Sequence, residues 1–216
     1  PSSKTELISP FFNGPLEGSK GFEGLVALLD RLREILPFQD ATITLRSDIP
    51  VGAGLGASAA IASALVQAAF DLTDHPLDAG THFDLIQLSE GYFHTNPSGI
   101  DAYLSIHDEA LRYRKDQSPE SIHIDLDAHL VIAHSNVSGS TKDAVEQIAK
   151  MMKDKKTSKK MADLGHITLN ALEAIQAKDL KKIGQLMNDA HGLLKEFNVS
   201  HPVLDDLVDQ ALNHGA

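Results

Sequence analysis

Apolar residues recur every three or four positions along much of the chain, which is the pattern of amphipathic helices. One stretch, 57–72, is built mainly from small apolar residues. From Thr141 onward the pattern is helical, and Asp179 stands where a side chain can cap the start of a helix. The helices predicted in this way cover residues 21–36, 57–72, 77–92, 180–197 and 202–213.

A second pattern, with a period of two or a short apolar run, marks strands. Residues 41–47 alternate apolar with polar side chains, which favours a half-buried strand. Two or three further strands are predicted within 103–127, and the apolar run 129–134 predicts a buried strand. Residues 1–20 are rich in proline and glycine and are predicted to be loop.

The mixture of strands and helices gives way to purely helical sequence near residues 136–142. Asn136 and Gly139 lie at this change, and such residues are typical of loops between domains. The sequence therefore predicts a first domain over 1–138 and a second over 139–216. The lysine-rich stretch 150–160 is predicted to be a solvated loop or helix end.

Composition narrows the classes of function. The chain has 216 residues, a net charge of -11 and no cysteine. An acidic surface argues against a nucleic-acid partner, and the lack of cysteine excludes disulfides and thiolate metal sites. No apolar run is long enough to cross a membrane, so neither membrane nor nucleic acid is expected as a partner. We expect a cytoplasmic protein.

A glycine-rich segment follows the strand predicted at 41–47 and precedes the helix predicted at 57–72. Gly52, Gly54 and Gly56 stand at alternate positions, where glycine allows positive φ and a close approach of backbone to ligand. Backbone N–H groups that converge at a helix start bind phosphate. The predicted nucleotide-binding residues are Pro50, Gly52, Ala53, Gly54, Leu55, Gly56, Ala57, Ser58 and Ala59.

Other interpretations of this segment are a tight structural turn and a dinucleotide fingerprint. The glycine spacing does not fit the G-x-G-x-x-G of dinucleotide-binding folds, and no Gly-Lys-Ser/Thr follows as in a Walker A loop. A phosphate loop of another type and a structural turn both stay open on the residues alone.

Two carboxylates flank a turn later in the chain. Glu90 lies near the end of a predicted helix, and Asp101 follows Asn96-Pro97-Ser98-Gly99. Near a phosphate loop, one carboxylate can hold Mg²⁺ and the other can receive the proton of an attacking hydroxyl. A helix-end charge and an ordinary turn aspartate are the alternative.

Together these motifs resemble the GHMP kinases. P-x-x-x-G-L-G-x-S-A-A at 50–60 is similar to the second motif of that superfamily, with Ala57 where serine is usual. E-x-x-x-H-x-N-P-S-G-x-D at 90–101 is similar to its mevalonate kinase branch, with Thr95 in place of the usual glycine. Residues 136–142 resemble a third segment, found in the bacterial type, and Thr141 matches a threonine near the substrate. A threonine before a helix is also an ordinary N-cap candidate.

The resemblance implies a fold and a chemistry. It implies an α+β, two-domain architecture, with an N-terminal domain like domain 2 of ribosomal protein S5 and a ferredoxin-like C-terminal domain. It also implies ATP and mevalonate as substrates, in isoprenoid biosynthesis. Ser58 and Glu90 match the Mg²⁺-binding residues, and Asp101 matches the catalytic aspartate that contacts the substrate. His94 matches a family histidine for which we expect a structural role.

The same family has a lysine-bearing motif before this region and a third glycine-rich motif after it. Neither motif occurs in the sequence, so we expect the natural protein to extend beyond it at both ends. A homodimer is an open expectation. The alternatives are another GHMP-type kinase (phosphomevalonate, galactose or homoserine), a non-catalytic metabolite-binding member of the fold and, more remotely, a dehydrogenase.

Overall fold

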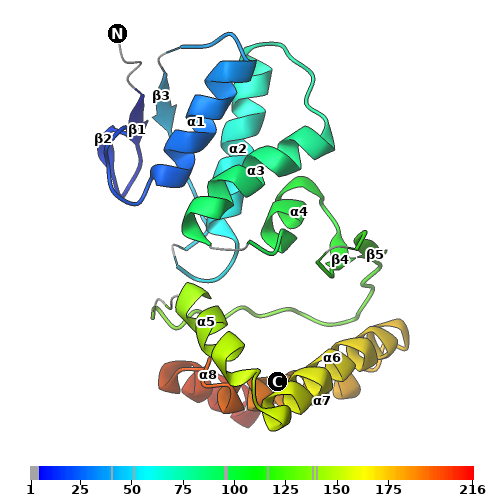
Figure 1. Cartoon of the computed structure of the whole chain (residues 1–216). Coiled ribbons are helices and arrows are strands. Elements are labelled where there is room, and N and C mark those ends of the chain that lie inside the picture. The colour runs from blue at the N-terminus through cyan, green and yellow to red at the C-terminus, as the bar shows by residue number, and fades with distance from the viewer. Residues whose placement is uncertain are drawn as a thin grey trace. The chain divides into compact units, whose positions relative to one another are not determined.

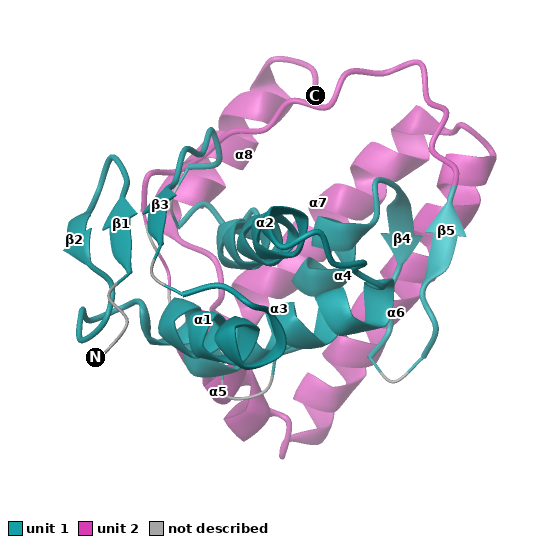
Figure 2. Ribbon diagram, turned by 90° about the horizontal axis from the view of Figure 1, so that it is seen from above, with its two compact units in different colours: residues 1–122 teal, residues 123–216 magenta. Residues whose placement is uncertain are grey.

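A computed structural model describes residues 5–39, 41–50, 52–94, 97–115, 117–137, 139 and 141–216. The chain divides into two compact units, residues 1–122 and 123–216 (Figure 2). The domain boundary at 138/139 stays a prediction.

The first unit combines a small sheet with helices (Figure 1). Strand β1 pairs antiparallel with β2 and parallel with β3, and β4 pairs antiparallel with β5. The elements in chain order are β1 (Glu6–Ile8), β2 (Asn13–Pro15), α1 (Glu23–Ile35), β3 (Thr42–Thr44), α2 (Ala57–Leu72), α3 (Ala79–Phe93), α4 (Ile100–Ile106), β4 (Ala110–Arg112) and β5 (Glu120–Ile122). This is the α+β content expected from the family resemblance.

Helix α1 supplies side chains to two apolar clusters. Its Leu29 packs with Leu7 of β1 and with Leu16 beyond β2. Its Leu28 and Leu32 pack in the larger cluster with residues of α2, α3 and α4. Because buried apolar area is the main stabilising term in folding, these clusters fix α1 between the sheet and the helices that carry the predicted site.

Helix α2 is buried along a stripe of small residues. Its buried positions recur at intervals of three and four residues, and half of them are alanine. Small side chains let α3 and α4 approach α2 closely. The buried residues are Ala59, Ala62, Ser63, Val66, Ala69 and Phe70.

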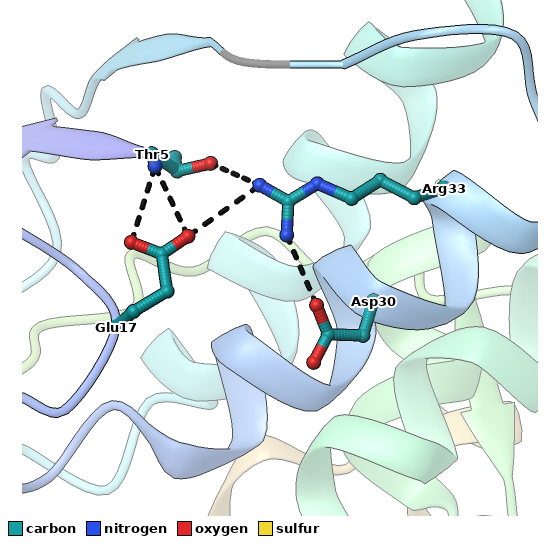
Figure 3. A network of polar contacts seen from close by, with 4 residues as sticks. All are labelled: Thr5, Glu17, Asp30 and Arg33. Atoms are coloured by element: carbon teal, nitrogen blue, oxygen red, sulfur yellow. Dashed lines mark hydrogen bonds and ion pairs between the residues drawn. The ribbon is translucent and has the colours of Figure 1, made fainter. Parts of the chain in front are cut away.

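A polar network also holds the start of the first unit (Figure 3). Arg33 of α1 donates to the Thr5 hydroxyl, and its other terminal nitrogen lies 3.0 Å from Asp30. Glu17 accepts from the Thr5 backbone N–H at 3.0 Å. Burial pushes the pKa of Glu17 up, but backbone hydrogen bonds from Glu17 and Thr5 and the Arg33 charge outweigh it, so the pKa is lowered.

The second unit is helical over its described elements. Helices α5 (Thr141–Met151), α6 (Lys155–Gln176), α7 (Leu180–Glu196) and α8 (Pro202–Asn213) follow one another. Asp154 and Asp179 cap α6 and α7 by accepting from the backbone N–H groups of Thr157 and Lys182. Phe197 is buried, and its carbonyl accepts from the Gln147 side chain at 3.2 Å, which ties α5 to the end of α7.

Three local predictions are wrong. Residues 1–20 are not all loop, because Leu7 is buried in β1 and Ser9 closes a hairpin by hydrogen bonding to Phe12. Tyr103 lies in α4 rather than in a strand, since its N–H bonds to the Gly99 carbonyl in the first helical turn.

The third wrong prediction is the buried strand at 129–134. Leu130, Val131 and Ile132 are 83%, 85% and 66% exposed. A strand needs a neighbour to satisfy its backbone groups, and none pairs with this segment among the residues that the structure describes.

Candidate active site

The glycine-rich segment adopts the backbone that its sequence predicts. Gly52, Gly54 and Gly56 have φ of 75°, 73° and 67°, in the left-handed region. Gly56 is the N-cap of α2 and provides no side-chain cap for the helix. The first N–H groups of α2 are therefore free of intrahelical partners and of a capping side chain, which suits an anion. Val51 lies outside the described residues.

Asp101 lies against this helix start. A Cβ added to Gly56 would lie 3.3 Å from Oδ1 of Asp101 and 3.6 Å from its Cγ. Asp101 is in the first turn of α4, and α4 packs on α2 through Ala102. The structure thus brings together two residues that are 45 positions apart in the chain, the last glycine of the loop and the second predicted carboxylate.

The turn before Asp101 rests on aromatic side chains that the sequence did not single out. Gly99 has φ of 90°, and a Cβ there would lie 2.7 Å from the Tyr113 hydroxyl and 3.1 Å from Phe83. Tyr113 donates to the Ser98 carbonyl at 2.5 Å. The ring of Tyr103 lies 4.9 Å from that of Phe83. The sequence could not reveal that these aromatic side chains support the turn, because this role depends on tertiary contacts.

Glu90 is a buried carboxylate near the end of α3. Its residue is 3% exposed, and its Oε1 has no hydrogen-bond partner within the described part of the chain. Its Oε2 lies 3.7 Å from Nε2 of His94, one helical turn later. A buried acceptor without a donor is costly, and a cation is one partner that removes this cost.

Glu90 and Ser58 offer oxygen atoms of the kind that Mg²⁺ takes as ligands. Mg²⁺ prefers oxygen ligands and is usually held by one or two protein groups together with substrate phosphates and water. Glu90 offers an unpartnered carboxylate oxygen, and the Ser58 hydroxyl lies in the first turn of α2. No cluster of three His, Asp or Glu side chains suited to a metal occurs within the described residues, so such a site would need phosphate oxygens.

The structure gives less information on the other predicted site residues. Thr141 is the first residue of α5 in the second unit and is exposed. Thr95 and Asn96 of the acidic motif lie outside the described residues, as do Ser138 and Ser140.

A cavity of about 590 Å³ lies beside α2, the start of α3 and the end of α4. Ser63, His82 and Ser105 line it, whereas Ser58, Glu90 and Asp101 do not. Burial lowers the pKa of His82, although its hydrogen bond with Ser63 acts in the opposite direction.

Comparison with protein families gives two matches. Residues 23–109 match the GHMP kinases N-terminal domain, and residues 171–216 match the GHMP kinases C-terminal domain. The first match contains the glycine-rich segment, Glu90 and Asp101. No described helix is long and apolar enough to span a bilayer.

Similar proteins point in the same direction. The mevalonate kinase of Aeropyrum pernix is 33% identical over 180 residues, which is 81% of this chain and 55% of that protein. The mevalonate kinase of Thermococcus sibiricus is 35% identical, over 81% of this chain and 54% of that protein. The chain thus spans about half the length of these curated relatives.

Solved structures share the fold. The L. major mevalonate kinase in complex with R-mevalonate matches with a TM-score of 0.73 at 22% identity, covering 100% of this chain and 68% of that one. The Methanococcus jannaschii mevalonate kinase matches with the same TM-score, 0.73, at 18% identity, over 96% of this chain and 70% of that one.

Proposed function

This chain belongs to the GHMP kinases, and from that premise we propose that the full-length protein is a mevalonate kinase. It transfers the γ-phosphoryl group of ATP to the C5 hydroxyl of (R)-mevalonate and releases 5-phosphomevalonate and ADP. The observation that supports this proposal is the proximity of Asp101 to Gly56 at the start of α2, since a carboxylate beside the glycine-rich segment suits phosphoryl transfer. The mevalonate kinase names of the relatives support the choice of substrate.

In the proposed mechanism, backbone N–H groups over residues 52–58 bind the phosphates. Asp101 accepts the proton of the attacking hydroxyl and orients that oxygen towards the γ-phosphorus. Ser58 and Glu90 would hold the Mg²⁺ that accompanies ATP. When bound, Mg²⁺ neutralises charge on the phosphates. Most of the rate enhancement then comes from positioning and charge stabilisation.

Thr141 is proposed to contact the substrate. This assignment rests on the resemblance of residues 136–142 to the family segment and on the place of Thr141 as the first residue of α5.

The substrate is tested directly by offering the purified full-length protein Mg·ATP with mevalonate, phosphomevalonate, galactose or homoserine. We expect ADP release with mevalonate. If only another acceptor were phosphorylated, the proposal would be wrong and the protein would be another GHMP-type kinase. Asp101→Asn removes the proton acceptor while keeping the side-chain size. Its kcat is expected to fall by about 10²- to 10⁴-fold, whereas ATP binding, followed by calorimetry, is expected to persist.

The same variant distinguishes an enzyme from a metabolite-binding protein of the same fold. A binding protein would show no acceptor-dependent ADP release, and Asp101→Asn would leave its ligand affinity nearly unchanged.

A further inference from the structure

Ser63 stands at the meeting point of α2, α3 and α4, the helices that carry Ser58, Glu90 and Asp101. It lies on α2, five residues after Ser58, and it is 7% exposed. Its hydroxyl oxygen lies 3.0 Å from Nε2 of His82 on α3 and 3.1 Å from the Ser105 carbonyl oxygen on α4.

The direction of each hydrogen bond follows from the partners. The Ser105 carbonyl can only accept, so the single hydroxyl hydrogen of Ser63 points to it. His82 Nε2 must then carry a hydrogen and donate to the Ser63 oxygen. The same nitrogen lies 3.3 Å from the backbone carbonyl of Ser63, which also accepts only. His82 is 8% exposed, and its neutral form with hydrogen on Nε2 satisfies all of these contacts.

Helix α4 needs such an anchor because it is short. A helix of seven residues cannot form alone, and the last carbonyls of any helix lack intrahelical partners. Ser63 satisfies one of these terminal carbonyls. Within α4, the Ser105 hydroxyl donates to the Asp101 carbonyl at 2.7 Å, so the anchored turn is bonded directly to the residue that contacts Gly56.

We propose that Ser63 is a positioning residue, whose hydroxyl joins α2, α3 and α4 and thereby holds Asp101 at the glycine-rich loop. The proposal rests on the proposed function for its kinetic effect, and on the hydrogen bonds alone for its structural part. It assigns to Ser63 no contact with substrate, nucleotide or metal.

The decisive variant is Ser63→Ala in the full-length protein. Removal of the hydroxyl leaves the Ser105 carbonyl unpaired and lets α4 shift. Since a misplacement of about 1 Å can cost 10²-fold in rate, we expect kcat to fall by about 10- to 100-fold. The KM for ATP is expected to change by less than about threefold, because the loop amides still bind ATP as they do in the wild type.

Two further variants separate positioning from a general loss of stability. Ser63→Thr keeps the hydroxyl, and the cavity of about 590 Å³ beside Ser63 has room for the extra methyl group, so it should restore most of kcat. Ser89→Ala is the matched control, because Ser89 is a buried serine whose hydroxyl has no partner in the described part of the chain. It should keep the wild-type kcat.

A structural readout makes the outcome independent of the substrate. Hydrogen exchange of the α4 amides is expected to be faster in Ser63→Ala than in the wild type and unchanged in Ser89→Ala. An unchanged kcat in Ser63→Ala, with an active wild type, overturns the positioning role. A wild type that does not phosphorylate mevalonate overturns the proposed function instead, and the exchange of the α4 amides in Ser63→Ala, faster or unchanged, still decides whether Ser63 holds α4 in place.

Discussion

At the scale of single residues, Gly56 and Asp101 form one feature. The backbone of Gly56 has φ of 67°, and the space where a side chain would start is next to the Asp101 carboxylate. A phosphate loop needs backbone N–H groups that a ligand can reach, and a glycine with this φ provides them. Because Gly56 has no side chain, the Asp101 carboxylate can also approach these N–H groups.

Gly56→Ala should therefore damage both stability and turnover. The left-handed backbone costs an L-residue about 1–2 kcal/mol, and the new methyl group would lie 3.3 Å from Asp101 Oδ1. We expect a loss of about 1–2 kcal/mol in the free energy of unfolding, measured in urea. Displacement of Asp101 should also lower kcat by about tenfold or more.

Gly54→Ala is the matched comparison for this variant. Gly54 also has positive φ, 73°, but a Cβ there would meet no atom within 4 Å. Both variants should lose similar stability and bind ATP less tightly. Only Gly56→Ala should also have a lower kcat, because only its new side chain displaces Asp101. Equal kcat values for the two variants would show that the Asp101 contact has no catalytic consequence.

At the scale of elements, the packing of α1 on α3 depends on a second glycine. Gly24, in the first turn of α1, is buried against the end of α3. A Cβ on Gly24 would lie 2.5 Å from the Ser89 carbonyl oxygen and 2.7 Å from the Phe93 ring. Both distances are below any normal contact, and one partner is backbone, so the helices would have to separate.

Gly24→Ala is expected to lower the free energy of unfolding by about 1–3 kcal/mol, as overpacking does elsewhere. Gly91→Ala, on the exposed side of α3 with no atom within 4 Å of its Cβ, should instead raise it by up to about 1 kcal/mol through helix propensity. Urea unfolding of the two variants measures the difference. If Gly24→Ala had the same free energy of unfolding as Gly91→Ala, α1 and α3 would be able to accommodate the methyl group without loss of stability.

The elements that the sequence predicted well are those with a long, local signal. Apolar spacing places α1, α2 and α8, and the capping residue Asp179 helps to place α7, because helical contacts link residues three and four apart. The strand predicted at 129–134 failed for the opposite reason. Its apolar residues predict burial, but a strand depends on a partner elsewhere in the chain, which no local pattern reveals.

The site shows the same division. The sequence alone identified Gly56 and Asp101 as candidates, since their turn chemistry and charge are local features. It could not show that Gly56 and Asp101 lie together, because they are 45 positions apart. Nor could it show that Ser63 of α2 bonds to α3 and α4, because these hydrogen bonds join residues 19 and 42 positions apart. Tyr113 was missed for the same reason.

At the scale of the whole molecule, the net charge of -11 opposes the binding of an anion such as ATP. Under the proposed function, affinity for ATP would therefore come from local groups, the loop amides and a cation at Glu90, rather than from the surface as a whole. Each unit combines buried apolar residues with a polar network, around Arg33 in unit 1 and around Asp205 in unit 2.

Asp205, in the first turn of α8, accepts three hydrogen bonds or ion pairs from its own unit. Ser200 donates to its Oδ1 at 2.7 Å, His191 Nε2 lies 3.0 Å from the same oxygen, and Lys195 lies 3.2 Å from Oδ2. The Ser200 hydrogen bond, together with Lys195 and His191, outweighs the effect of burial and lowers the pKa of Asp205 below its ordinary value of 3.8.

This lowered pKa makes the second unit sensitive to acid in a defined direction. A carboxyl group with a lower pKa in the folded state stabilises it fully above pH 3.8, and the contribution is lost as pH falls through the folded-state pKa. Asp205→Asn should therefore be less stable than the wild type at neutral pH, and the gap should close below pH 3.8. Hydrogen exchange of α7 and α8 amides, followed from neutral pH to pH 3, measures it locally.

Asp209→Asn is the control, because Asp209 is an exposed residue of the same helix whose side chain makes no hydrogen bond or ion pair with another described residue. It should leave exchange in α7 and α8 unchanged at every pH. In Asp205→Asn, exchange in α1, α2 and α3 should also stay at wild-type rates, since all partners of Asp205 lie within residues 191–205. A gap that stays constant down to pH 3 would show that the Asp205 network acts through packing rather than through its charge.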